Sequence, residues 1–207
     1  MSQRFAIHPT HPQPRLIKQA AALVRDGGLI VYPTDSCYAL GCAMDAADAV
    51  ARLRALRGID DRHHLSIVCR DLAQAGRYVR LDNWQFRVVR QGVPGPYTFV
   101  LPATREVPRR LKHAKRGTLG VRVPAHPVAT ALVEELGEPL LSSSLVLPGD
   151  DAPLNDGEAI VAALGRRIDA FVDAGPCAGE PSTVIDLAEP PGEIVRRGLG
   201  DPAALGL

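Results

Sequence analysis

The 207-residue sequence is poor in aromatic residues, which make up 4% of it, and shows no excess of either charge. Its 24 Lys and Arg against 23 Asp and Glu leave a formal net charge of +1. No overall field therefore draws the chain to nucleic acid, so any such binding must come from local basic patches. Few aromatic side chains are present for stacking on unpaired bases.

Long apolar runs and paired cysteines are also absent. No apolar stretch approaches the roughly 20 residues that span a bilayer, and residues 1–5 lack the apolar region of a secretion signal. We therefore expect a soluble, cytoplasmic protein with no membrane partner. The four cysteines form no Cys-x-x-Cys pair, which favours reduced, mostly structural thiols and no metal site.

Several motifs of nucleotide-binding and hydrolytic enzymes are missing as well. No Gly is followed by Lys, which excludes a Walker phosphate loop, and no Gly-x-Gly-x-x-Gly opens a helix. The zinc-protease spacing and the Gly-x-Ser-x-Gly elbow are absent. A bound nucleotide would have to be held by scattered hydroxyls, arginine side chains and helix N-termini.

Helical and strand-like patterns alternate along the chain, without a repeat or a long linker. The hydrophobic spacing and the capping residues predict helices over 14–25, from Asp45 to about Leu56, after Asp71, after Asp82, over 128–136 and from Asn155 to about Gly165. Strands are predicted at 29–32, 65–68, 97–101, 118–123, 140–145, 170–172, 183–185 and 194–195. We predict one α/β domain over residues 1–207.

A cluster of polar side chains follows the apolar strand that ends at Tyr32. Thr34, Asp35, Ser36 and Tyr38 lie within five residues of one another, beside the turn residue Pro33. Ligands of open α/β sheets bind where strands end, which favours a binding role. The alternative is that Thr34 and Asp35 simply cap a turn.

Five segments resemble motifs of the YrdC/YciO family, in the family's own order. Residues 33–41 resemble its P-T-D-T-x-Y-G-L-G signature, 94–101 its P-G-P-x-T strand and 120–127 its V-R-x-P-x-H-P segment. Residues 181–186 resemble P-S-T-V-V-D, and 196–198 resemble R-x-G. One such match would be weak, but five in order cover nearly the whole chain.

The resemblance implies a YrdC-like fold, a twisted open mixed sheet flanked by helices with a basic concave cleft. In enzymatic members it implies the joining of threonine and bicarbonate, with ATP and Mg²⁺, to give threonylcarbamoyl-adenylate. That product is used to modify an adenosine next to the anticodon of tRNA, a step linked to translation. Members are also described as binding double-stranded RNA. No tightly bound cofactor is implied.

The matched segments, together with two incomplete motifs that contain Arg57 and Ser144, supply the candidate site residues. We assign them as Arg57 and Arg122 for catalysis, Thr34, Tyr38 and Thr98 for the amino-acid substrate, and Ser144, Ser182 and Arg196 for the nucleotide. Guanidinium groups bind phosphate bidentately, so Arg57 and Arg196 are expected at the phosphates. Two alternatives stay open: Ser144 as a small, closely packed strand residue, and Arg196 as a charge that protects a sheet edge.

Two family motifs are incomplete. The enzymes carry a K-x-R pair, where this chain has Arg57 and Ile59, and an S-x-N motif, where it has Ser144 and Val146. These departures resemble the YciO branch of the family and predict attenuated synthase chemistry. Other cations near the lost Arg position are Arg54, Arg62, His63 and His64.

Two basic clusters suggest contact with RNA. Residues 105–116 hold six Lys and Arg and one Glu, and we select Arg109, Arg110 and Lys112 as candidate RNA ligands. A second cluster lies in residues 52–64. The alternative is a solvated loop. The rival function is a non-catalytic double-stranded RNA-binding protein that acts on tRNA or in ribosome assembly.

Overall fold

The computed structural model of the protein describes residues 2–60, 63 and 65–207. Its α-helices are α1 (Pro14–Arg25), α2 (Ala47–Arg57), α3 (Leu72–Tyr78), α4 (Asn83–Gly92), α5 (Pro127–Leu136) and α6 (Gly157–Leu164). Its strands are β1 (Gln3–Ala6), β2 (Ile30–Tyr32), β3 (Ala39–Ala43), β4 (Ser66–Val68), β5 (Tyr97–Pro102), β6 (Thr118–Arg122), β7 (Leu140–Ser144), β8 (Ala170–Asp173), β9 (Thr183–Asp186) and β10 (Glu193–Arg196). The candidate cations Arg62 and His64 lie outside the described residues.

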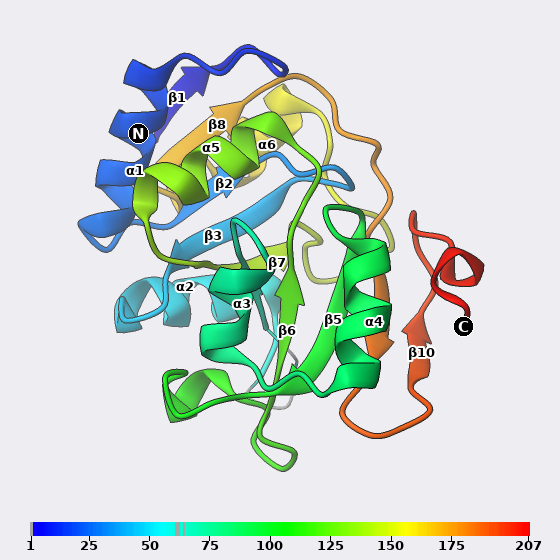
Figure 1. The fold of residues 1–207 in the computed structure, drawn as a ribbon. Coiled ribbons are helices and arrows are strands. Elements are labelled where there is room, and N and C mark those ends of the chain that lie inside the picture. The colour runs from blue at the N-terminus through cyan, green and yellow to red at the C-terminus, as the bar shows by residue number, and fades with distance from the viewer. Residues whose placement is uncertain (1, 61–62, 64) are drawn as a thin grey trace.

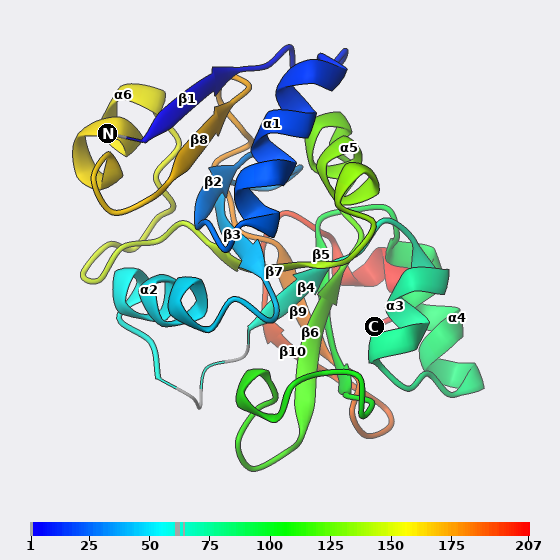
Figure 2. The same ribbon diagram turned by 90° about the vertical axis from the view of Figure 1, so that its left-hand side faces the viewer.

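The strands form one mixed sheet in the order β1-β8-β2-β3-β7-β4-β6-β5-β9-β10. The sheet contains both parallel pairs, such as β4 with β6, and antiparallel pairs, such as β3 with β7. Helices flank the sheet, and Figures 1 and 2 show its strong twist between the β1 end and the β10 end. This confirms the predicted mixed α/β sheet. Within the described part of the chain, no helix is both long and apolar enough to cross a bilayer.

Two strands, β1 and β3, were not predicted. β3 follows the polar turn directly and pairs antiparallel with β2, so that Tyr32 lies opposite Ala39 and Ile30 lies opposite Gly41. It contains small residues and is buried along four of its five positions, so it shows no polar–apolar alternation. β1 pairs with β8 at the edge and buries only Phe5.

Two of the predicted helix caps are confirmed. The Asp71 carboxylate accepts a hydrogen bond from the backbone NH of Gln74, 2.7 Å away, at the start of α3. Asp82 and Gln85 form a capping box at the start of α4.

Two other predicted caps are wrong. α2 begins at Ala47 behind the N-cap residue Ala46, so the Asp45 side chain does not cap it. The cap of α6 is Asp156, whose carboxylate accepts from the NH of Ala159 at 2.8 Å. The side-chain amide of Asn155 instead donates to the backbone carbonyl of Cys177 and accepts from the backbone NH of the same residue. These two hydrogen bonds tie the loop before α6 to the loop after β8.

One face of the sheet changes character along its width. Residues opposite each other in neighbouring strands point to the same face, and one such row runs Ala170, Ile30, Gly41, Ser142, Ser66, Gly120 and Val100. At its apolar end, Ala170 and Ile30 belong to a hydrophobic cluster with α1 and α5. Figures 1 and 2 show these two helices side by side over that end.

The rest of that face carries small and polar side chains instead, beyond the two helices. The opposite face is apolar across the sheet, because residues of α2, α3, α4 and α6 cluster with buried side chains from β3 to β9. The fold therefore leaves one half of one sheet face to be lined by residues that no helix covers.

Candidate functional site

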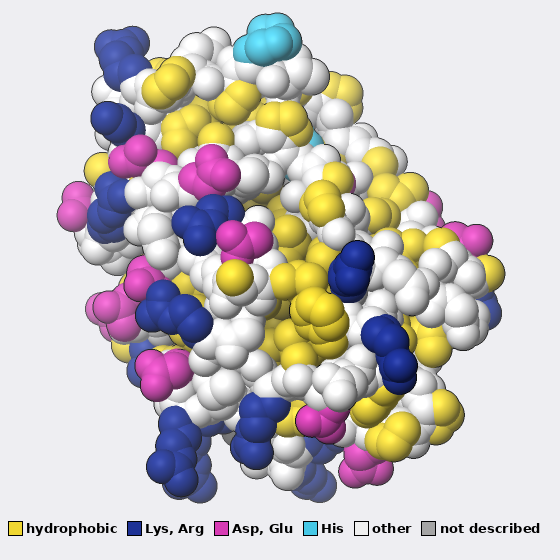
Figure 3. Space-filling view, in the orientation of Figure 1, with side chains coloured by type: hydrophobic (Ala, Val, Ile, Leu, Met, Phe, Trp, Pro, Cys, Tyr) yellow, Lys and Arg dark blue, Asp and Glu magenta, His cyan; other side chains and the backbone are white. Residues whose placement is uncertain are grey.

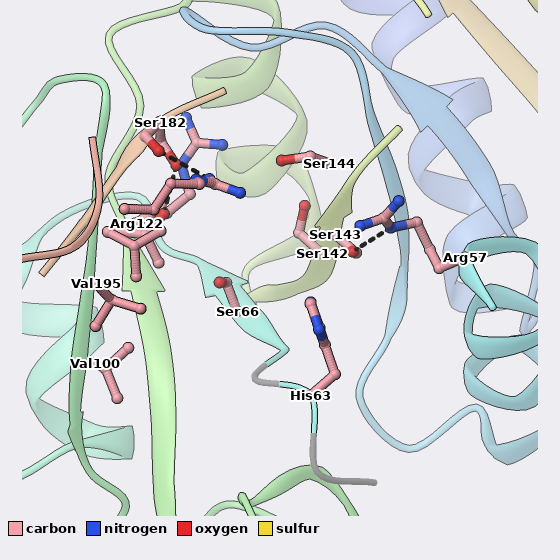
Figure 4. Close-up of a pocket in the computed structure, with 13 residues that line it drawn as sticks. Arg57, His63, Ser66, Val100, Arg122, Ser142, Ser143, Ser144, Ser182 and Val195 are labelled. Atoms are coloured by element: carbon pink, nitrogen blue, oxygen red, sulfur yellow. Dashed lines mark hydrogen bonds between the residues drawn. The ribbon is translucent and has the colours of Figure 1, made fainter. Parts of the chain in front are cut away.

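A cavity of about 430 Å³ lies over this polar half of the sheet face. Its walls come from five strands, from the end of α2 and from β10, as Figure 4 shows. The lining residues are Arg57, His63, Ser66, Thr98, Val100, Arg122, Ser142, Ser143, Ser144, Ser182, Val184, Val195 and Arg196. Six of the eight residues predicted for catalysis, for the amino-acid substrate and for the nucleotide are among them.

The charge of this lining is positive. It includes three arginines and one histidine, and no Asp or Glu is found among the lining residues that the structure describes. Burial lowers the pKa of Arg57, and the charge of Arg196 lowers it further. Burial likewise lowers the pKa of Arg196, with Arg122 adding to the effect. Cations that raise one another's energy in this way favour the entry of an anion.

Arg122 is the most deeply buried of these cations, with 3% of its surface exposed. Its Nη2 donates to the Asp35 carboxylate at 2.8 Å and to the Ser36 hydroxyl at 3.0 Å. Its Nε is buried and finds no acceptor among the described residues. A buried donor without a partner is costly, so an oxygen atom of a bound anion would satisfy it.

Asp35 connects two of the family motifs. One carboxylate oxygen accepts from Arg122, and the other accepts from the backbone NH of Ala125 at 2.9 Å. The turn after β2 and the segment after β6 are therefore fastened together through one side chain. Sequence analysis placed Asp35 in the polar turn and did not assign it this role.

The last two motifs also pack against each other. Arg196 donates to the carbonyl of Ser182 at 2.8 Å, and the NH of Leu199 donates to the carbonyl of Pro181 at 2.9 Å. A Cβ atom on Gly198 would lie 2.2 Å from that Pro181 oxygen. Only glycine fits this approach, which explains the Arg-x-Gly pattern in physical terms. The side chain of Ser182 meanwhile pairs with Thr98 at 2.7 Å.

Arg57 reaches the cavity from the end of α2. Its Nε donates to the hydroxyl of Ser143 at 3.1 Å, and its Nη1 donates to the carbonyl of Val146. The residue at the missing Asn position thus contributes its backbone to holding Arg57. Ile59, at the missing Arg position, packs against the hydrophobic core and supplies no cation.

Thr34 and Tyr38 lie outside the cavity lining and are buried. The Thr34 hydroxyl donates to the carbonyl of Cys37 at 2.6 Å, as the turn-capping alternative describes. The Tyr38 hydroxyl donates to the carbonyl of Gly175 at 2.7 Å. These hydroxyls hold loops in the structure, and their contact with an amino-acid substrate stays a prediction.

The cavity also contains residues that sequence reasoning did not select. Ser66, Val100 and Val184 share the face of the selected strand residues, and Val195 lies near Val100 in Figure 4. His63, named from the sequence as a cation near the lost Arg position, also lines the cavity. The only signal for the strand residues was alternation combined with pairing register, which requires knowing which strands are neighbours.

The candidate RNA ligands lie away from this cavity. Arg110 donates to the backbone carbonyls of Met44 and Asp45 at 2.9 and 3.1 Å, and Lys112 donates to that of Thr104 at 2.6 Å. Arg109 is exposed. Figure 3 shows Lys and Arg side chains gathered at the lower end of that view, over the segment between β5 and β6.

The expected Mg²⁺ has no set of protein ligands here. The part of the chain that the structure describes holds no group of three or more His, Cys, Asp or Glu suited to a metal ion. The cavity lining offers hydroxyls and cations, but no carboxylate.

The comparisons with known proteins agree with this geometry. Residues 22–198 match the family model Sua5/YciO/YrdC, which is described as "Telomere recombination". YciO of Escherichia coli is 48% identical over 201 residues, covering 97% of this chain and 98% of that protein. The crystal structure of E. coli YciO superposes with a TM-score of 0.97, covering 99% of this chain and all of that one.

Some more distant relatives are named as enzymes. The threonylcarbamoyl-AMP synthase of Halorhodospira halophila is 39% identical over 165 residues, covering 79% of this chain and 85% of that protein. The crystal structure of P. abyssi Sua5 complexed with L-threonine has a TM-score of 0.87 at 27% identity, covering 95% of this chain and 58% of that one. Four of the five motifs supply residues to the lining of one cavity. Together with that geometry, these matches show that the chain belongs to the Sua5/YciO/YrdC family.

Proposed function

We propose that this protein binds ATP in the arginine-lined cavity and makes threonylcarbamoyl-adenylate from ATP, bicarbonate and threonine at an attenuated rate. The observation that carries the proposal is the convergence of Arg57, Arg122 and Arg196 on one cavity without a lining carboxylate. The synthase names of the relatives and the threonine complex of P. abyssi Sua5 support the reaction and the amino acid.

The proposed reaction requires stabilisation of negative charge on the phosphate oxygens of ATP. The threonine amine attacks bicarbonate and water leaves, giving a carbamate. A carbamate oxygen then attacks the α-phosphorus of ATP, the bond from that phosphorus to the bridging oxygen breaks, and pyrophosphate leaves. Negative charge moves onto phosphate oxygens in this step, and preorganised guanidinium donors stabilise it. Arg57, Arg122 and Arg196 would supply those donors, with Ser144 and Ser182 near the nucleotide.

The missing motif residues set the expected rate. Each lost hydrogen bond to a charged group costs about 1.5–3 kcal/mol, so losing two costs about 3–6 kcal/mol. If both contacts act in the transition state, this corresponds to a rate lower by about two to four decades.

Pyrophosphate release tests the proposal. With ATP, bicarbonate and threonine all present, we expect slow release that stops when any one is omitted and falls strongly in Arg122→Ala. Val146→Asn, which restores the missing amide and leaves the backbone contact to Arg57 in place, should raise the rate. A folded wild-type protein without release above the omission controls would refute the proposed synthase activity.

A second candidate function is binding of double-stranded RNA through the segment 105–116. The supporting observation is the gathering of Lys and Arg side chains at the lower end of Figure 3. Arg109 and Arg110 of this segment are exposed. Affinity for an RNA duplex should then fall steeply as salt rises. It should also weaken in Arg109→Gln and in Lys112→Gln, and equal affinity in the variants would remove this surface from consideration.

A further inference from the structure

Besides its three arginines, the cavity has one titratable side chain that can carry a positive charge among its described residues. His63 lines it at the rim, where it is exposed to solvent, and Figure 4 shows its ring on the same side as Ser66 and Ser142. Its backbone NH donates to the carbonyl of Asp60 at 3.3 Å, which fastens the residue to the turn that follows α2.

His63 lies on the segment after α2, four residues beyond Ile59, which stands where the family enzymes have the Arg of their K-x-R pair. Ile59, four residues earlier, packs into the core and contributes no charge to the cavity. His63 lines the cavity whereas Ile59 does not, and its imidazole can gain or lose a proton near neutral pH.

The surroundings of His63 disfavour its protonation. Partial burial lowers its pKa below the ordinary value, and three arginines lower it further: Arg54 and Arg57 on α2 and Arg196 on β10. Asp60, on its own turn, is the one described acid that acts in the opposite direction on it. Because burial and the arginines outweigh this acid, protonation of the imidazole is disfavoured, and added negative charge in the cavity would favour it.

A bound polyphosphate brings that charge. It neutralises the arginines that oppose protonation and offers oxygens to an imidazolium N–H. Arg122 Nε, buried and without an acceptor in the described part of the chain, independently indicates that an anion belongs in this cavity.

We propose that His63 is an anion ligand of this cavity and takes up a proton when a polyphosphate binds. This deepens the proposed function, since it uses the same cavity. It does not require turnover, because binding alone drives the proton uptake.

Calorimetry with inorganic pyrophosphate tests the proposal. Titrations at pH 6 and pH 8, each in two buffers of different ionisation enthalpy, measure affinity and proton uptake together. Pyrophosphate titrates in this range too, but its contribution is the same for every variant. The difference between variants therefore reports on His63.

We expect the wild type to lose about tenfold more affinity than His63→Ala between pH 6 and pH 8, which corresponds to a one-unit change in a single pKa. Proton uptake should fall in His63→Ala by up to one proton per site. His63→Arg, whose charge is permanent, should bind tightly at both pH values. His8→Ala, on the exposed segment before α1, is the matched control and should behave as wild type.

Two results would overturn the inference. One is an equal pH dependence in wild type and His63→Ala with both proteins folded by circular dichroism, and the other is the absence of pyrophosphate binding. Neither result decides the proposed synthase activity, which the three-substrate assay tests separately.

Discussion

Removing the Asp35 carboxylate should destabilise the fold far more than removing a surface charge. Its ion pair with Arg122 is buried, with 9% and 4% of the two side chains exposed. Taking away one partner of a buried pair costs about 3–5 kcal/mol, because the other charge is left uncompensated. Asp35→Ala also removes the acceptor of the Ala125 NH. For a chain of this size we expect the melting temperature to fall by roughly 6–20 °C.

The measurement is urea unfolding followed by circular dichroism, with linear extrapolation to water. Arg70→Ala is the matched control, because it breaks the Arg70–Asp71 pair, whose side chains are 47% and 45% exposed. It should cost no more than about 1 kcal/mol. The double variant Asp35→Ala/Arg122→Met removes the stranded charge and should be more stable than Asp35→Ala alone.

A loss below about 1 kcal/mol in Asp35→Ala would contradict this reasoning, since it would mean that Arg122 does not depend on its partner. A double variant less stable than Asp35→Ala would also contradict it.

Three further predictions concern local geometry and pH. Asp156→Ala should destabilise the protein by about 1 kcal/mol in urea unfolding, because the NH of Ala159 loses its acceptor, whereas Asn155→Ala should leave the start of α6 intact in amide exchange. Gly198→Ala should weaken pyrophosphate binding in calorimetry by displacing Arg196, since its Cβ would meet the Pro181 carbonyl; unchanged affinity would refute this. Burial raises the pKa of Tyr32 to about 12, so the unfolded chain, with a phenol pKa of about 10, releases that proton first and stability falls from about pH 10 to 12. Tyr32→Phe should flatten this part of the stability–pH curve, and an unchanged slope would exclude the phenol as its source.

The positions of most helices and strands along the chain could be predicted from hydrophobic spacing and turn residues. Helices such as α1 and α5 show a clear apolar stripe with Pro at the start. β3 could not, since its residues are buried between neighbouring strands and carry small side chains without alternation. The prediction that Asp45 caps α2 was wrong, because capping depends on the local backbone path, which the residue type does not specify.

The candidate site was predictable in part for a similar reason. Arg122, Ser182 and Arg196 could be selected because each lies within a short motif that the sequence retains. Ser66 and Val184 carry no such pattern, and they enter the cavity only because β4 and β9 occupy particular places in the sheet. Thr34 was selected on its hydroxyl, but the backbone of the turn uses that hydroxyl.

One face of the sheet changes from apolar to polar along its width, so the same strand register positions both the hydrophobic core and the lining of the cavity. A shift of β7 by one residue against its neighbours would turn Ser142 toward the core and bring Leu141 into the ligand's space, while Ser66 of β4 stayed in place. Misregistered chains would thus lose the cavity and the core together. Divergence in ligand preference within such a scaffold is therefore expected through exchange of individual side chains, with the strand alignment kept unchanged.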